Sequence, residues 1–245
     1  MVDEANPLQG RLPAVGLFGV SATFHYVGPA LAVMLFGLVA PSGVAWLRIA
    51  TAAVVLAVWR RPWRTVRRMS RRGLGLLGAM GGVLAVMNVS FYLAIDRLPL
   101  GTVGAIEFGG VIVLAALGVR SRRNLVALLL AVGGVLLLAD VHLVAEPVGL
   151  AFALVNCLGF TAYVVLGHRM AGDGAVSGLD RLSLAMLVGL VMVTPIGLGA
   201  VAPQLTDPVV LAAGIAIGVC SSVIPYAIDQ VVMARLSRGG FAILL

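Results

Sequence analysis

The longest uncharged stretch of the sequence runs from residue 12 to residue 47, between Arg11 and Arg48. A transmembrane helix needs about 20 consecutive apolar residues, so this stretch is too long for a single crossing. Pro41, Ser42 and Gly43 break it and offer a new helix start. The stretch therefore predicts two consecutive transmembrane helices.

Similar apolar runs recur along the whole chain. Of its 245 residues, 61% are hydrophobic and only 11% are charged, too few to cover the surface of a soluble domain of this size. The 31 glycines fit a membrane protein, where small residues let helices approach closely. We predict an all-α membrane protein with eight complete spans, at about 13–36, 41–59, 73–95, 99–119, 124–140, 147–167, 179–200 and 208–230.

The basic residues, all of them arginines, predict the orientation. With a cytoplasmic N-terminus, the connections after the second, fourth, sixth and eighth spans also face the cytoplasm. Those connections hold Arg60, Arg61, Arg64, Arg67, Arg68, Arg71, Arg72, Arg120, Arg122, Arg123, Arg169, Arg181, Arg235 and Arg238. The opposite loops hold only Arg97, beside the acidic residues Asp96, Asp140, Glu146 and Asp207. This asymmetry predicts a multi-pass protein of the inner membrane.

Several features have a simpler explanation than a special site. The basic run 60–72 with Trp59 and Trp63 is better explained by an interface with lipid headgroups than by nucleic-acid binding. Cys157 and Cys220 lie inside apolar runs and lack metal-ligand spacing. No nucleic-acid partner, metal or cofactor is therefore expected.

The two halves of the chain resemble each other weakly. Residues 41–47 correspond to 176–182, and Ala94-Ile95-Asp96 corresponds to Ala227-Ile228-Asp229, in the same order. The first unit, residues 1–140, would hold five helices, so the second unit, residues 147–245, enters the membrane from the other side. This predicts an inverted 5+5 repeat, with substrate sites between the halves near mid-membrane.

The second unit stops short of its counterpart. After Arg238 only residues 239–245 remain, enough for the first turns of a ninth helix. By comparison with the first unit, about 35 residues are missing. We expect the chain to be a truncated product of a ten-helix protein.

Several short motifs resemble those of a known family. They are Pro41 with Ala45-Trp46-Leu47-Arg48, Asn88 with Tyr92-Leu93-Ala94-Ile95, Arg97-Leu98-Pro99-Leu100-Gly101, Ile106-Glu107-Phe108, and Ser222-Val223-Ile224-Pro225-Tyr226. This order is similar to that of the EamA-type drug/metabolite transporter superfamily, most of all its threonine/homoserine exporter branch. The resemblance implies ten helices in two inverted repeats and export of amino acids or similar small metabolites.

Two charged residues lie inside predicted spans. Arg48 and Glu107 each lie about two turns from the outer end of their helices, roughly 10–12 Å deep. A charge in the bilayer interior is costly unless it is paired or hydrated. Three readings stay open: a permanent ion pair, direct binding of substrate or proton, and an Arg48 side chain that snorkels to the interface.

Uncharged polar residues gather at a similar depth. Asn88 and Asn156 are candidates for substrate binding or for interhelical hydrogen bonds. His25 is either a proton-coupling group or a buried neutral histidine. Tyr92 and Tyr226, like Tyr163, line a pocket or fill the core. Pro195 and Pro225 interrupt their helices, as tolerated kinks or as parts of a site.

No catalytic motif is found, so an enzyme is not expected. The predicted function is secondary export of amino acids or similar metabolites by alternating access, with proton coupling as one option. The alternative is a non-transporting membrane scaffold or an inactive truncated fragment. The sequence leaves the oligomeric state open.

Overall fold

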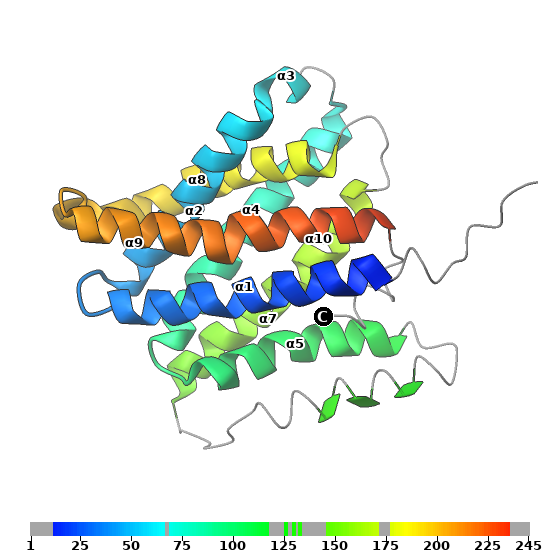
Figure 1. Ribbon diagram of the computed structural model, residues 1–245, viewed down its shortest axis with the longest axis horizontal. Helices are drawn as coiled ribbons and strands as arrows, with labels where there is room; N and C mark the ends of the chain where they lie inside the picture. The colour runs from blue at the N-terminus through cyan, green and yellow to red at the C-terminus, as the bar shows by residue number, and fades with distance from the viewer. Residues whose placement is uncertain are drawn as a thin grey trace, which may run out of the picture.

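The computed structural model describes residues 12–66, 69–117, 125–126, 129–130, 132–133, 146–171 and 177–235. Within these ranges the regular structure is entirely helical, as predicted. The elements are α1 (Leu12–Leu35), α2 (Pro41–Arg60), α3 (Trp63–Val66), α4 (Arg71–Ile95), α5 (Leu100–Leu117), α7 (Pro147–Ala171), α8 (Gly178–Val201), the short 3-10 helix Ala202–Gln204, α9 (Pro208–Gly218), a π-helical turn (Val219–Val223) and α10 (Ile224–Arg235) (Figure 1).

Five helical segments are long and apolar enough to cross a membrane. They are Pro41–Arg60, Arg71–Ile95, Pro147–Met170, Gly178–Gln204 and Pro208–Val231, with Gly19–Leu35 and Leu100–Leu114 as shorter apolar helices. Each coincides with a predicted span. The predicted span 124–140 falls largely outside the described residues, and the predicted start of a ninth helix, residues 239–245, lies wholly outside them.

The helix ends follow from local sequence. Pro41 and Pro208 occupy the first turns of α2 and α9, where a missing N–H costs nothing. The Ser70 hydroxyl accepts a hydrogen bond from the Gly73 N–H at the start of α4. Helix α2 ends where Arg61 adopts a left-handed conformation and its N–H closes onto the Ala57 carbonyl.

The helices pair across the two halves of the chain. Helix α2 packs on α8, α4 packs on α7 and α8, and α1 packs on α9 and α10. Where α2 meets α8, Gly197 lies directly against Trp46, whose indole N–H donates to Thr194 Oγ1 at 3.0 Å. Small residues at such crossings let the backbones approach, as the glycine content predicted.

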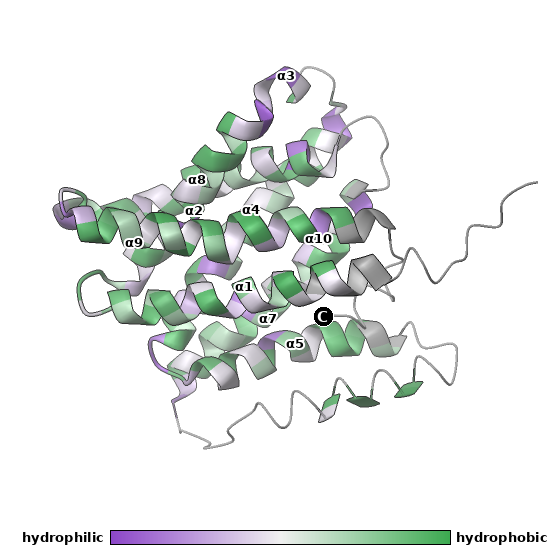
Figure 2. Ribbon diagram, in the orientation of Figure 1, coloured by the Kyte–Doolittle hydropathy of each residue, from purple (hydrophilic) through white to green (hydrophobic). Residues whose placement is uncertain are grey.

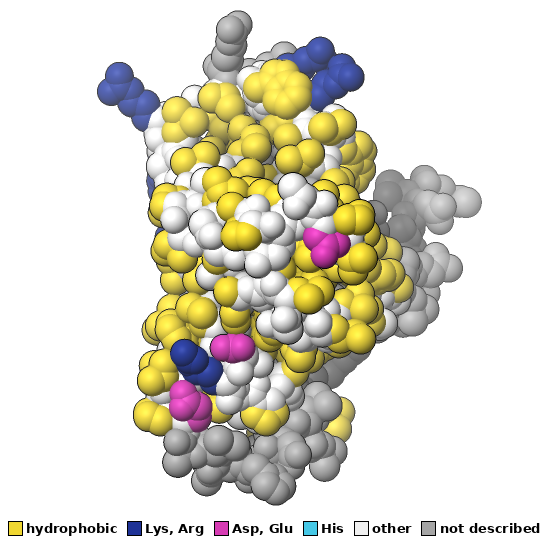
Figure 3. Space-filling view, turned by 90° about the vertical axis from the view of Figure 1, so that its left-hand side faces the viewer, with side chains coloured by type: hydrophobic (Ala, Val, Ile, Leu, Met, Phe, Trp, Pro, Cys, Tyr) yellow, Lys and Arg dark blue, Asp and Glu magenta, His cyan; other side chains and the backbone are white. Residues whose placement is uncertain are grey.

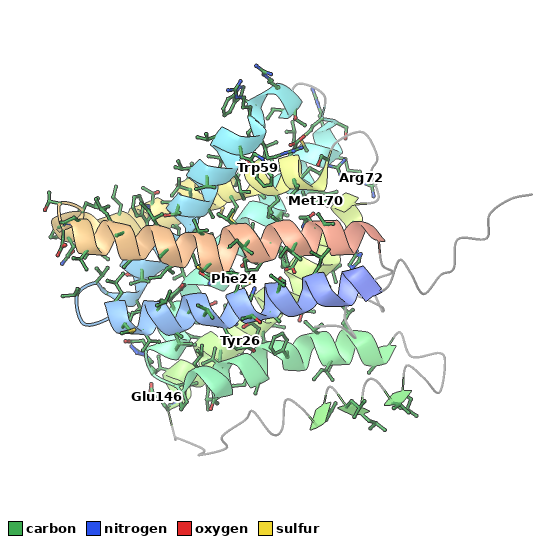
Figure 4. The ribbon with its side chains drawn as sticks, in the orientation of Figure 1. Phe24, Tyr26, Trp59, Arg72, Glu146 and Met170 are labelled. Atoms are coloured by element: carbon green, nitrogen blue, oxygen red, sulfur yellow. The ribbon has the colours of Figure 1, made fainter. Side chains whose placement is uncertain are left out.

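Most residues along the helices are hydrophobic, and hydrophilic residues occur mainly at the helix ends, with a few in the middle of the bundle (Figure 2). Glu146 lies at the end opposite Arg72 and Met170 (Figure 4). The end that carries Glu146 has acidic side chains on a largely apolar and neutral surface (Figure 3). At the other end the Arg60 Nε lies 2.7 Å from Asp180 Oδ1 and joins α2 to α8.

The crossing of α2 and α8 provides a stability test. A Cβ added at Gly197 would collide with the Trp46 side chain and with the Ser42 carbonyl, 2.9 Å away. We expect Gly197→Ala to lower the free energy of unfolding by about 1–3 kcal/mol through overpacking. Thermal unfolding of the detergent-purified protein measures this. Gly199→Ala is the matched control, since a Cβ there meets nothing within 4 Å. Equal stability of the two variants would contradict this packing.

Candidate functional site

The residues that the sequence singled out come together around one small cavity. It is lined by His25, Arg48, Asn88, Glu107, Asn156 and Tyr226, with Pro29, Met87 and Phe91 completing the wall. Tyr92, the remaining predicted residue, stacks against Arg48. These side chains come from α1, α2, α4, α5, α7 and α10. The cavity therefore lies where both halves of the chain meet.

Arg48 is buried, with 3% of its surface exposed, so it does not snorkel. Its Nε donates to Ser222 Oγ at 2.7 Å, and its Nη2 donates to the Ser221 carbonyl at 2.6 Å. The rings of Tyr92 and Tyr226 lie 5.6 and 5.9 Å from its guanidinium carbon. Neutral acceptors and ring faces thus hold the charge.

A break in the helix explains why the Ser221 carbonyl is available. Pro225 lies four residues later and has no N–H to donate back to it. The same segment forms a π-helical turn, in which the Ile224 N–H bonds the Val219 carbonyl. Such turns are frequent at functional sites. Sequence reasoning named Pro225 as a break but missed Ser221 and Ser222 as the groups that hold Arg48.

Glu107 occupies another wall of the cavity, and 6% of its surface is exposed. The permanent ion pair considered from the sequence is not formed: neither Arg48 nor Glu107 has a salt-bridge partner among the described residues. Asn156 adjoins Glu107 across the cavity wall. A carboxyl and a guanidinium thus face one cavity without neutralising each other by contact.

Several polar atoms at the site lack hydrogen-bond partners among the described residues. They are Asn88 Oδ1, the Tyr92 hydroxyl, and both Oδ1 and Nδ2 of Asn156, whose polar neighbours are the side chains of Tyr226, Arg48 and Glu107 respectively. The Asn88 amide nitrogen donates to the Leu84 carbonyl at 2.7 Å, and the Asn88 side chain adjoins Tyr226. Buried polar atoms are normally paired, so these orphans indicate room for a polar ligand or water.

Aromatic side chains surround the remaining wall. The His25 ring lies 5.9 Å from Tyr226 and 6.2 Å from Phe160, measured between centroids. Tyr163 stacks on Phe160 in the core instead of lining the cavity. Tyr26 points from α1 toward α5, where its ring lies 6.3 Å from Phe108 (Figure 4). These rings fix the position of His25 and Tyr226 in the site.

This arrangement suits a small molecule that carries both charges. A guanidinium donates charge-assisted hydrogen bonds to a carboxylate, and a carboxylate accepts them from an ammonium group. The cavity volume is about 10 Å³, which is room for about one water molecule. Entry of anything larger requires the walls to separate.

Comparison with characterised proteins gives consistent relatives, while no protein-family model matches the chain. The threonine/homoserine exporter RhtA of Escherichia coli strain K12 is 32% identical over 238 residues, covering 96% of this chain and 78% of the relative. The protein of the same name from Salmonella typhimurium strain LT2 is 31% identical over 221 residues, covering 89% and 73%.

The contact between Ser222 and Arg48 provides the test of this geometry. We expect Ser222→Ala to lower the free energy of unfolding by about 1.5–3 kcal/mol, because it removes an acceptor from a buried charge. Chemical denaturation of the purified protein measures it. Ser90→Ala is the matched control, since the buried Ser90 hydroxyl donates only to carbonyls of its own helix. Equal losses in both variants would refute a special role for Ser222.

Proposed function

Because the chain belongs to the family of the threonine/homoserine exporter RhtA, an EamA-type branch of the drug/metabolite transporters, we propose that it exports threonine, homoserine or a similar amino acid. The chain is a multi-pass membrane protein and a transporter, not an enzyme. The observation that carries the proposal is the cavity that Arg48 and Glu107 share without an ion pair between them.

The two charges match the backbone groups of an amino acid. In the proposed complex the substrate carboxylate binds the Arg48 guanidinium, and its ammonium group binds the Glu107 carboxylate. Both protein charges are then neutralised by the substrate itself, which relieves the cost of holding them unpaired in the membrane. The substrate takes the place of the ion pair that the protein does not form.

The orphan amide atoms match the side chain of a hydroxylated amino acid. A hydroxyl group donates one hydrogen bond and accepts others, which fits the amide groups of Asn88 and Asn156 at the cavity wall. An analogue without the hydroxyl leaves these buried groups unpaired and is bound less well. The relatives named for threonine and homoserine support this side-chain assignment.

The helix pairing supports an inverted-repeat architecture with units 1–140 and 147–245. In such a repeat α4 corresponds to α9–α10, and α7 corresponds to α1. The contact between α4 and α7 therefore corresponds to the contact of α9–α10 with α1, and both contacts are observed. Helices α2 and α8 correspond to each other, so their mutual contact is its own counterpart in the repeat. Rocking of one unit against the other would open the cavity to each side in turn, as expected for alternating access in a ten-helix transporter.

The arginine distribution supports an inner-membrane protein with a cytoplasmic N-terminus. Arg72 and Met170 lie at one end of the bundle and Glu146 at the other (Figure 4). Arg169 directly precedes Met170, whereas Arg97 Nε lies 3.9 Å from Glu146 Oε1. Arginine-rich connections stay on the cytoplasmic side of bacterial inner membranes. The acidic end would then face the periplasm, and the basic end the anionic cytoplasmic leaflet.

Neutralising the two site charges tests the transport function. We expect Arg48→Gln and Glu107→Gln each to slow threonine efflux from preloaded proteoliposomes by about 30-fold or more, because each leaves a substrate charge unpaired in a desolvated site. Arg64→Gln and Glu146→Gln are the matched controls, at surface positions on the two ends of the bundle. Full efflux by both site variants would exclude this mode of binding. Absence of efflux by the unmodified chain would favour a non-transporting scaffold.

The orientation is tested separately by cysteine labelling. A cysteine introduced at Arg64, in a background where Cys157 and Cys220 are replaced by alanine, is expected to be shielded from an impermeant maleimide in intact cells. A cysteine at Gln204, between α8 and α9, is expected to react. The opposite labelling pattern would reverse the proposed topology.

A further inference from the structure

One buried carboxylate takes no part in the site described above. Asp229 lies on α10, and 2% of its surface is exposed. It is three residues, about one helical turn, beyond Tyr226 of the cavity. It has no ion-pair partner among the described residues. Carboxylates inside a membrane are costly, and those retained there mark proton relays or ion pathways.

One hydrogen-bond partner of Asp229 comes from the other half of the chain, in addition to Tyr163 of α7. The Ser21 hydroxyl on α1 lies 3.0 Å from Asp229 Oδ1 and also 3.3 Å from the Pro225 carbonyl. A hydroxyl has one hydrogen to donate, so it serves one of these acceptors at a time. Ser21 thus lies between the carboxylate and the proline break that supplies the carbonyl for Arg48.

Among the described residues no ion-pair partner of Asp229 is found, and its neighbours are mostly neutral groups. Helix α1 also contributes His25, one turn from Ser21, and α7 contributes Tyr163. On α10 itself the neighbours are Tyr226 and Gln230. Helix α8 also packs on α10, and its charged groups are engaged elsewhere, with Asp180 on Arg60 and Arg181 on the Met170 carbonyl. The carboxylate is therefore held by neutral groups.

The corresponding position in the first half is different. Ala94-Ile95-Asp96 matches Ala227-Ile228-Asp229 in the internal repeat, yet Asp96 lies exposed at the end of α4, 4.0 Å from Arg97. Of the two aspartates, only Asp229 is buried, and the residue that follows it in the sequence is not an arginine. The helix continues past Asp229 to Arg235, so this carboxylate lies inside the bundle and not at its surface.

We propose that Asp229 and Ser21 form a proton-binding site whose occupancy is coupled to the Arg48 site through the proline break. In one state Asp229 is ionised and accepts the Ser21 hydrogen. When Asp229 takes up one proton at an oxygen, its need for a donor is removed, and Ser21 donates to the Pro225 carbonyl instead. Release of the proton restores the first arrangement.

This switch links the proton to the substrate by a contiguous chain of contacts. Pro225 and Tyr226 belong to the segment whose carbonyl, hydroxyl and ring hold Arg48. A shift of Ser21 between the two acceptors changes how α1 holds this segment and hence the position of Arg48. The coupling is reciprocal, so substrate binding favours one protonation state of Asp229. The transport part of this inference rests on the proposed export function, but proton binding does not.

The first experiment follows the proton without any substrate. Infrared difference spectra of the purified full chain, recorded between acidic and alkaline pH, report the carbonyl band of a protonated carboxylic acid. We expect a pH-dependent band in the unmodified protein and in Glu107→Gln that is missing in Asp229→Asn. In Ser21→Ala the band is expected to persist at a displaced frequency. An unchanged band in Asp229→Asn would overturn the proton site, whatever the chain transports.

The second experiment measures coupling in proteoliposomes. We expect Asp229→Asn to keep threonine–threonine exchange near the unmodified rate while losing accumulation driven by a pH gradient by about tenfold or more. Asp229→Glu, which keeps a carboxyl group, is expected to retain part of the gradient-driven accumulation. Gradient-driven accumulation at the full rate in Asp229→Asn would overturn the coupling.

The Ser21→Ala variant keeps the test decisive if Asp229→Asn folds poorly. It retains the carboxylate and removes only the shared donor, so fewer protons should move per threonine while exchange continues. An unchanged proton-to-threonine ratio in Ser21→Ala would overturn the linkage. If the unmodified chain exchanges no threonine, the proposed function fails, and the infrared bands still decide whether Asp229 binds a proton.

Discussion

The structure depends on how a single arginine is held inside an apolar bundle. An uncompensated arginine at the centre of a membrane helix costs about 2.5–3.5 kcal/mol on insertion scales. Hydrogen bonds from Arg48 to a serine hydroxyl and a backbone carbonyl, together with contacts to two tyrosine rings, offset this cost. The carbonyl is free because Pro225 cannot donate to it. Burying the charge therefore required a break in a helix of the other half of the chain, and this ties the two halves together at the site.

The choice of neutral acceptors has a consequence for binding. A salt bridge with Glu107 would satisfy both charges and leave little reason for a zwitterion to enter. With Arg48 held by dipoles instead, Glu107 and the amides of Asn88 and Asn156 remain available around the same cavity. The cavity, with a volume of about 10 Å³, is too small for an amino acid. Opening along the contacts of α2 with α8 and of α1 with α10 would expose these groups without unfolding any helix.

Much of this site was predictable because depth in a membrane can be counted along a helix. Arg48, Glu107, Asn88 and Asn156 were placed at similar depth from span boundaries alone, and the structure brings them to one cavity. The partners were not predictable, since Ser222 lies 174 residues from Arg48 and nothing local selects it. The ion pair, one of the three readings that the sequence left open, does not form for the same reason: equal depth and opposite sign favour a contact, but lateral packing decides it.

Asp229 shows a second limit of the sequence. The eighth span was predicted to end at about residue 230, and the sequence assigned no role to Asp229 within it. In the structure α10 continues to Arg235 and packs against α1, so the same three-residue motif yields one exposed and one buried carboxylate. A repeat with strict symmetry would bury both or neither. The asymmetry gives only one half of the described chain a buried titratable group beside the proline break.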